Sequence, residues 1–304
     1  MFKKTVLTLA MLGVTTVANA DVLTSIKPLG FIANAITDGV TETKVLLPVT
    51  ASPHDYSLKP SDIEKLKSAQ LVVWVGDGLE AFLEKSIDKL PKEKVLRLED
   101  VPGIKMIVDA TKKKDHDHHD HDHDHEHIHG HHHDKDWHIW FSPEASQLAA
   151  EQIAERLTAQ LPEKKAKIAE NLAAFKANLA DKSNEITQQL QAVKDKGYYT
   201  FHDAYGYFER AYGLNSLGSF TINPTIAPGA KTLNAIKENI AAHKAQCLFA
   251  EPQFTPKVID SLSKSTAVKV GQLDPLGAKV KLSKTAYPQF LQAIADEFSQ
   301  CLTQ

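Results

Sequence analysis

Residues 162–196 read PEKKAKIAENLAAFKANLADKSNEITQQLQAVKDK, and this stretch decides the fold. Its apolar residues recur at intervals of three, four and once seven positions, so they share one face of a helix. They are Ile168, Leu172, Phe175, Leu179, Ile186, Leu190 and Val193. Pro162 suits the first turn of a helix, and Gly197 suits a cap at its C-terminal end. The stretch predicts one helix of 35 residues, about 50 Å long, although a break near residues 181–183 into two shorter helices is the alternative.

Short apolar runs alternate with helical patterns on both sides of this helix. They occupy residues 22–26, 44–47, 71–75 and 95–98 before it, and residues 198–201, 214–220, 247–249 and 267–272 after it. Such runs are typical of buried parallel strands. The sequence therefore predicts an α/β fold with two α/β lobes, residues 21–161 and 197–304, joined by a rigid linking helix at residues 162–196.

The first 20 residues have the pattern of a signal peptide. Lys3 and Lys4 precede an apolar run at residues 5–17, and residues 18–20 are Ala-Asn-Ala. The run is shorter than the ~20 residues that span a bilayer, so a membrane anchor is not favoured. We expect cleavage after Ala20 and release into the periplasm. The new N-terminal residue would be Asp21 and not Cys, which leaves no site for a lipid anchor.

The balance of charge excludes one class of partner. Loss of Lys3 and Lys4 takes the formal net charge from −3 to −5, and residues 111–136 contribute −4 of this through four Lys, seven Asp and one Glu. The rest of the chain is close to neutral. A basic patch for nucleic acid is therefore not expected.

Cys247 and Cys301 are the two cysteines of the chain. In the oxidising periplasm they favour a disulfide, which would close a loop of about 55 residues and stabilise the fold by roughly 4 kcal/mol. The alternative is a pair of buried, unpaired thiols. A cysteine-based metal site is not favoured, because neither residue has a CxxC partner.

Eleven of the fifteen histidines are concentrated in one acidic run at residues 112–136. They are His116, His118, His119, His121, His123, His125, His127, His129, His131, His132 and His133. The run contains a single aliphatic residue, Ile128, so we expect a disordered loop. Interleaved imidazoles and carboxylates indicate weak binding of several zinc ions, which would be dispensable for a tight site. An inert, solvated spacer is the alternative.

Three of the remaining histidines follow a different pattern. His54, His138 and His202 each lie in a segment where we expect a strand to end and a loop to begin. Ligands of open α/β sheets bind at this edge, so the three positions predict a shared site. His243 lies in a helical stretch, and we expect it on the surface.

Four segments resemble signature segments of ZnuA-type periplasmic zinc-binding proteins. They are ASPHDYSLKPSD at residues 51–62, WHIWFSPE at 137–144, FHDAYGYF at 201–208 and GQLDPLG at 271–277. The resemblance covers essentially the whole mature chain. It implies two α/β lobes joined by a long helix, with a metal ion in the cleft between them that is delivered to an ABC importer. It also implies that His54 and His138 are ligands from the first lobe and His202 is the ligand from the second.

The ligand set favours zinc as the metal. Three neutral imidazoles suit Zn²⁺, whereas Mn²⁺ prefers more carboxylate oxygen. In similar proteins that carry manganese, the position of His202 is typically Glu. The fourth ligand stays open: some relatives have a metal-binding Glu where this chain has Pro53, which leaves Asp274 or water as candidates. Asp274 could instead orient an imidazole.

We therefore expect a monomeric periplasmic receptor that binds Zn²⁺ and passes it to the membrane permease of an ABC importer. A zinc buffer or chaperone without an importer is one alternative. A zinc hydrolase is another, since three histidines and water also form a catalytic arrangement. The acid nearest the proposed site, Asp274, is itself a candidate ligand or partner of an imidazole, so we do not expect an enzyme.

Overall fold

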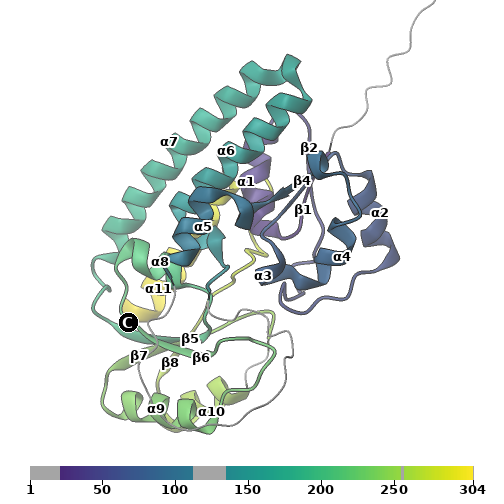
Figure 1. The fold of residues 1–304 in the computed structure, drawn as a ribbon. Coiled ribbons are helices and arrows are strands. Elements are labelled where there is room, and N and C mark those ends of the chain that lie inside the picture. Colours follow the sequence, from purple (N-terminus) through teal and green to yellow (C-terminus); the bar gives the residue numbers. More distant parts are fainter. Residues whose placement is uncertain (1–20, 112–134, 255–256, 304) are drawn as a thin grey trace, which may run out of the picture.

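The computed structural model describes residues 21–111, 135–254 and 257–303. The expected signal peptide and residues 112–134 of the histidine-rich run lie outside the described residues. Figure 1 shows two lobes, one above the other, with a long helix along one side. Among the helices of the described ranges, none combines the length and the apolar character needed to cross a membrane.

The first lobe contains a parallel four-stranded sheet in the order β2-β1-β3-β4. Its strands are β1 (Asp21–Thr24), β2 (Glu42–Val45), β3 (Leu71–Trp74) and β4 (Val95–Arg97). The helices around it are α1 (Lys27–Thr37), α2 (Pro60–Ser68), α3 (Asp77–Glu80), α4 (Glu84–Ile87) and α5 (Pro102–Asp109), with 3-10 turns η1 (Ala81–Leu83), η2 (Lys92–Lys94) and η3 (Leu98–Asp100). All four residues of β3 are buried, as a parallel strand covered on both faces requires.

The second lobe repeats the architecture with a parallel sheet in the order β6-β5-β7-β8. Its strands are β5 (Gly197–His202), β6 (Ser216–Thr221), β7 (Ala245–Ala250) and β8 (Lys269–Gln272). Its helices are α8 (Gly206–Tyr212), α9 (Ala230–Ala241), α10 (Lys257–Thr266) and α11 (Ala286–Thr303). The prediction of two α/β lobes with parallel sheets is confirmed.

The long helix is present but ends earlier than the sequence pattern predicts. It follows α6 (Pro143–Gln160), begins with the 3-10 turn η5 (Pro162–Lys164) and continues as α7 (Lys165–Leu190), without a break near residues 181–183. Gly197 is not its cap, because this residue opens β5. A Cβ atom there would lie 2.2 Å from the carbonyl oxygen of Lys244, so the glycine allows β5 to approach β7 closely.

One apolar core crosses from the first lobe to the second. The buried face of α7 packs against α11, for example where the rings of Phe175 and Tyr287 lie 5.7 Å apart between centroids. The same core includes strand residues of both sheets. A smaller core beneath α9 and α10 covers the other face of the second sheet. The two lobes are thus held together by shared packing.

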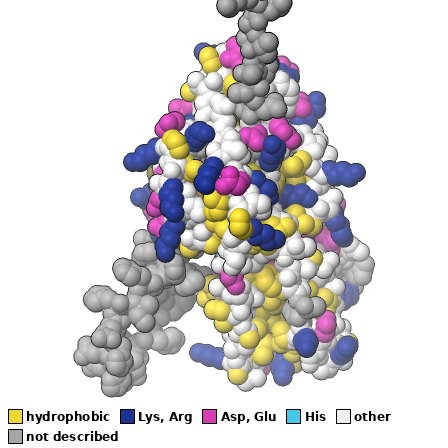
Figure 2. Space-filling view, turned by 90° about the vertical axis from the view of Figure 1, so that its right-hand side faces the viewer, with side chains coloured by type: hydrophobic (Ala, Val, Ile, Leu, Met, Phe, Trp, Pro, Cys, Tyr) yellow, Lys and Arg dark blue, Asp and Glu magenta, His cyan; other side chains and the backbone are white. Residues whose placement is uncertain are grey.

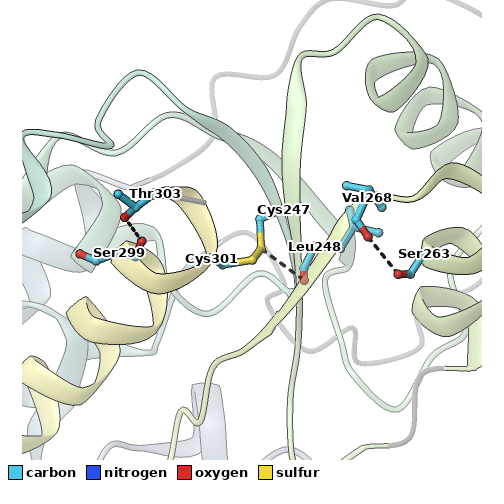
Figure 3. The surroundings of a disulfide bond; sticks show 7 residues. All are labelled: Cys247, Leu248, Ser263, Val268, Ser299, Cys301 and Thr303. Atoms are coloured by element: carbon cyan, nitrogen blue, oxygen red, sulfur yellow. Dashed lines mark hydrogen bonds between the residues drawn. A yellow bond between two sulfur atoms is a disulfide. The ribbon is translucent and has the colours of Figure 1, made fainter.

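A disulfide joins Cys247 to Cys301, as the sequence predicts, with 6.1 Å between the Cα atoms. Figure 3 shows that it connects the end of α11 to β7. Gly271 of the neighbouring strand makes room for this contact, because a Cβ atom there would lie 2.6 Å from the ring of Phe249 and 3.1 Å from the Cβ of Cys301.

Candidate metal centre

The three isolated histidines come from three different connections. His202 is the last residue of β5, and His54 lies in the loop that follows β2. The expectation of a strand end is wrong for His138, which lies between α5 and the 3-10 turn η4 (Ile139–Phe141). The apolar residues Ile139, Trp140 and Phe141 that form this turn are buried. The turn leads directly into α6, whose first turn is capped by the side chain of Ser142.

The Nε2 atoms of these histidines converge on one point between the lobes. The Nε2 atom of His138 lies 3.1 Å from that of His54 and 3.3 Å from that of His202. A tetrahedral zinc ion with bonds of 2.0–2.1 Å separates its ligand nitrogens by about 3.3 Å, so the spacing fits one ion. The three side chains form a group of metal-binding type whose ligand atoms all lie within 4.8 Å of one another.

Residues of both lobes enclose this point. Several lining residues are buried, including Trp140, Glu251 and Leu276. Others are partly exposed, including Ser52 of the first lobe and Phe254 of the second. The pocket is therefore buried over part of its lining and reaches the surface over the rest, which we call its open side.

Glu251 orients the imidazole of His202. The Nδ1 atom of His202 lies 2.6 Å from Oε1 of Glu251, and the hydroxyl of Tyr205 donates to the same oxygen at 3.1 Å. Burial and then the charge of Glu251 raise the pKa of Tyr205 well above its ordinary value, so its hydroxyl stays a donor. Because a carboxylate accepts the Nδ1 hydrogen, the Nε2 lone pair of His202 is left to face the metal position.

Asp136 has the same role for His138. Its Oδ1 accepts hydrogen bonds from the backbone N–H of His138 at 3.0 Å and from Nδ1 of that ring at 2.8 Å. The carbonyl of Asp136 accepts a hydrogen bond from Tyr207 of the second lobe, and the adjacent Lys135 pairs with Asp109 at 2.7 Å. The last two residues of the histidine-rich run are thus part of the described fold. We therefore expect the tight site to need Asp136, although the run as a whole was expected to be dispensable for it.

Glu251 and Asp136 were missed by sequence reasoning, although each left a signal. Asp136 lies two residues before His138 but looks like the end of an acidic run. Glu251 directly follows β7, the neighbour of β5, and the pairing of Thr200 with Phe249 places Glu251 beside His202 two residues further on. This adjacency depends on the strand order, which the sequence does not reveal.

Asp274 is not in the group formed by the three histidines. Its Oδ1 accepts hydrogen bonds from the side chain of Gln253 at 2.8 Å and from the backbone of Leu276 at 3.0 Å, and its Oδ2 accepts one from the backbone of Ala278 at 2.6 Å. Gln253 also donates to the carbonyl of Val49 in the first lobe at 3.2 Å. Asp274 therefore supports a contact between the lobes beside the metal centre.

One further histidine lies within the described residues. His243 is exposed, as expected, but it lies in the turn that follows α9 and not within a helix. The eleven histidines at positions 116–133 lie outside the described residues.

Comparison with known proteins decides the family. The profile of ZnuA, the zinc-uptake complex component A of the periplasm, matches residues 22–301. The chain belongs to the ZnuA family. ZnuA of Haemophilus ducreyi, described as a high-affinity zinc uptake system protein, is 98% identical over 310 residues, which cover 100% of both chains. ZnuA of Haemophilus influenzae, described in the same words, is 52% identical over 334 residues, 100% of this chain and 99% of that protein.

A solved structure supports the fold of this ZnuA-family chain. The periplasmic zinc-binding protein TroA from Treponema pallidum superposes with a TM-score of 0.77 at 20% identity and covers 93% of this chain and 99% of that one. The ZnuA family consists of substrate-binding proteins for transport, so the expectation that the chain is not an enzyme is confirmed.

Proposed function

We propose that the chain carries one zinc ion on the Nε2 atoms of His54, His138 and His202. The convergence of these nitrogens at the spacing of a single tetrahedral ion carries the proposal. Two of the rings are oriented by carboxyl groups, as is usual for histidines that bind zinc.

Family membership indicates the role of the zinc that the centre binds. As a ZnuA-type protein, the chain is a periplasmic zinc-binding receptor of an ABC importer, and its partner is a membrane permease. Zinc is cargo in this role, so the centre has to bind the ion tightly and also release it. A pocket between two lobes suits both tasks, because movement of one lobe separates the ligands.

Several finer features belong to the same proposal. We place the cleavage site after Ala20, because Asp21 begins β1 and its carboxylate pairs with Lys44 at 2.8 Å. A new N-terminus at Asp21 carries no cysteine for a lipid anchor. We further propose a monomer, because each chain brings its three imidazoles together without help from a second copy.

Water is the fourth ligand in this proposal. The oxygens of Asp274 already accept three hydrogen bonds, and Pro53 offers no donor atom on its side chain. A water molecule on the open side of the pocket would complete four-coordinate geometry. The histidine-rich run would add weak sites of lower affinity.

Metal analysis with chelator competition tests the proposal. The mature protein should hold one tight zinc ion per chain. His54→Ala should weaken this tight binding by at least about tenfold, because one of three imidazole ligands is lost, while His243→Ala, which removes an exposed histidine, should leave it unchanged. Tight binding that persists in His54→Ala would show that the site lies elsewhere.

Zinc-limited growth tests the transport role. In cells that lack their own receptor, the intact chain should restore zinc uptake, and His54→Ala should not. Restored uptake by both proteins would contradict the proposed centre.

A further inference from the structure

Two segments that contribute to the lining of the pocket contain no Asp, Glu, Lys or Arg. Charged residues make up 24% of the chain, yet residues 211–230 include none. The same holds for residues 45–54 across the pocket. The first segment contains β6, the edge strand of the second sheet, and the loop to α9, while the second leads from β2 to the first histidine of the centre.

The loop after β6 has an inner side and an outer side. On the inner side, Pro224 is buried and lines the metal pocket. On the outer side, Ile222 and Ile226 are 58% and 59% exposed, although both are large and apolar. Thr225, between them, is exposed as well. One short loop thus joins the wall of the pocket to an apolar patch on the surface.

The first lobe contributes a matching neutral edge. Pro48 and Thr50 are exposed, and Ser52 and Pro53 of the same segment line the pocket. We call Pro48, Thr50, Ile222, Thr225 and Ile226 the neutral rim.

Figure 2 views the molecule from the right-hand side of Figure 1. On the lower lobe, hydrophobic side chains form a band, and most charged side chains lie toward the margins of this band. Isolated apolar residues on a surface need no explanation, but a band of them on one face indicates a contact surface.

The absence of charge suits the passage of a cation to a receiving channel. Carboxylates would recapture a zinc ion as it leaves the histidines, and Lys or Arg would repel it. The two segments of the rim offer neither. A neutral rim also lets another protein seal the open side without burying unpaired charges, which are costly to desolvate.

We propose that the neutral rim is the surface that docks on the importer permease, around the entrance of its channel. This inference rests on the proposed function, because it needs a permease that receives zinc from the pocket. The permease should offer an uncharged surface to Ile222 and Ile226, and the contact should place the open side of the pocket against the channel.

Substitutions at Ile226 test the contact. Ile226→Asp and Ile226→Lys should each lower receptor-stimulated ATP hydrolysis by the importer in proteoliposomes by at least about tenfold, as expected for a buried contact residue. Zinc affinity in chelator competition should change by less than about twofold, because Ile226 is exposed and is not among the residues that line the pocket. Met106→Asp is the matched control: Met106 is 70% exposed on α5 and should tolerate the charge.

The outcomes separate the possible failures. Wild-type stimulation by both Ile226 variants would overturn the docking surface. Opposite effects of Asp and Lys would also overturn it, since they would indicate an electrostatic contact. A wild-type dimer that dissociates in both variants would assign the rim to a second copy of the chain. Failure of the wild-type chain to stimulate the importer would instead contradict the proposed function.

Discussion

The half of the metal centre that the second lobe provides is buried, whereas the half from the first lobe reaches the surface. The side chains of His202 and Glu251 are 4% and 1% exposed. Those of His138 and Asp136 are 7% and 17% exposed, and His54 is also partly exposed. Of the three proposed ligands, His202 and His138 are thus buried, and His54 of the first lobe is the one that water can reach. We infer that zinc enters and leaves past His54.

Removal of the buried ligand should have the largest effect. His202→Ala should weaken zinc binding by more than about 100-fold, the upper end of what loss of an outer partner costs. Water replaces the lost nitrogen poorly at a buried position, so this loss should exceed that of His54→Ala. Chelator competition on both variants measures the difference, and equal losses would contradict the contrast between the lobes.

Acid should weaken the centre by the next largest amount. Zinc binding needs unprotonated imidazoles, and a free histidine side chain titrates near pH ~6.5. Affinity should fall at least about tenfold for each pH unit below that value. Competition titrations at several pH values, with a chelator calibrated at each, measure the slope. Constant affinity between pH 7 and pH 5 would argue against an all-histidine site.

Removal of the two orienting carboxyl groups, Glu251 and Asp136, should lower zinc affinity by different amounts. Removal of such a partner typically costs 10- to 100-fold in affinity. Glu251→Ala should lie near the upper limit, because the His202 ring would lose its buried acceptor. Asp136→Ala should lie near the lower limit, because water can replace the carboxylate. Glu251→Gln, which keeps an oxygen acceptor, controls for misfolding, and a larger loss from Asp136→Ala would reverse the comparison.

Replacement of Asp274 should lower the stability of the fold more than it lowers the affinity for zinc. Asp274→Ala removes the acceptor of hydrogen bonds from two backbone N–H groups and from the side chain of Gln253. The free energy of unfolding, measured by denaturant titration, should therefore fall by roughly 1–3 kcal/mol. Zinc affinity should fall less than about tenfold. A loss as large as that of His202→Ala would identify Asp274 as a direct ligand.

The histidine-rich run should matter least for the tight site. Deletion of residues 115–134 keeps Lys135 and Asp136, which belong to the ordered first-lobe half. Calorimetry should show fewer weakly bound ions and an unchanged tightest constant. Loss of the tightest phase would mean that the run supplies a ligand to the centre.

Local periodicity was sufficient to predict the eight strands and the long helix. The spacing of apolar residues over a short stretch is enough to distinguish a buried strand from an amphipathic helix. The end of the helix was mispredicted because residues after Leu190 keep the apolar spacing, with Val193 buried, while the backbone already forms turns toward β5. Tertiary contacts rather than sequence pattern place that boundary.

The candidate site was predictable as three histidines but not as a complete centre. His54 and His202 follow apolar runs, which made their position visible. His138 reached the same group for a different reason, since its neighbours form a buried turn and not a strand. Glu251 became a partner only through the order of the strands, and that order depends on contacts between distant segments.

The disulfide between Cys247 and Cys301 can form only after the chain has been exported. Before export the chain is in a reducing compartment, where Cys247 and Cys301 remain thiols. The strand that ends beside Glu251 therefore lacks its covalent tie to α11 until the chain has crossed the membrane. We expect the second sheet to be looser, and its grip on zinc weaker, in a chain still awaiting export. Oxidation would then act as a maturation step that gives the receptor its full affinity only in the compartment where it collects zinc.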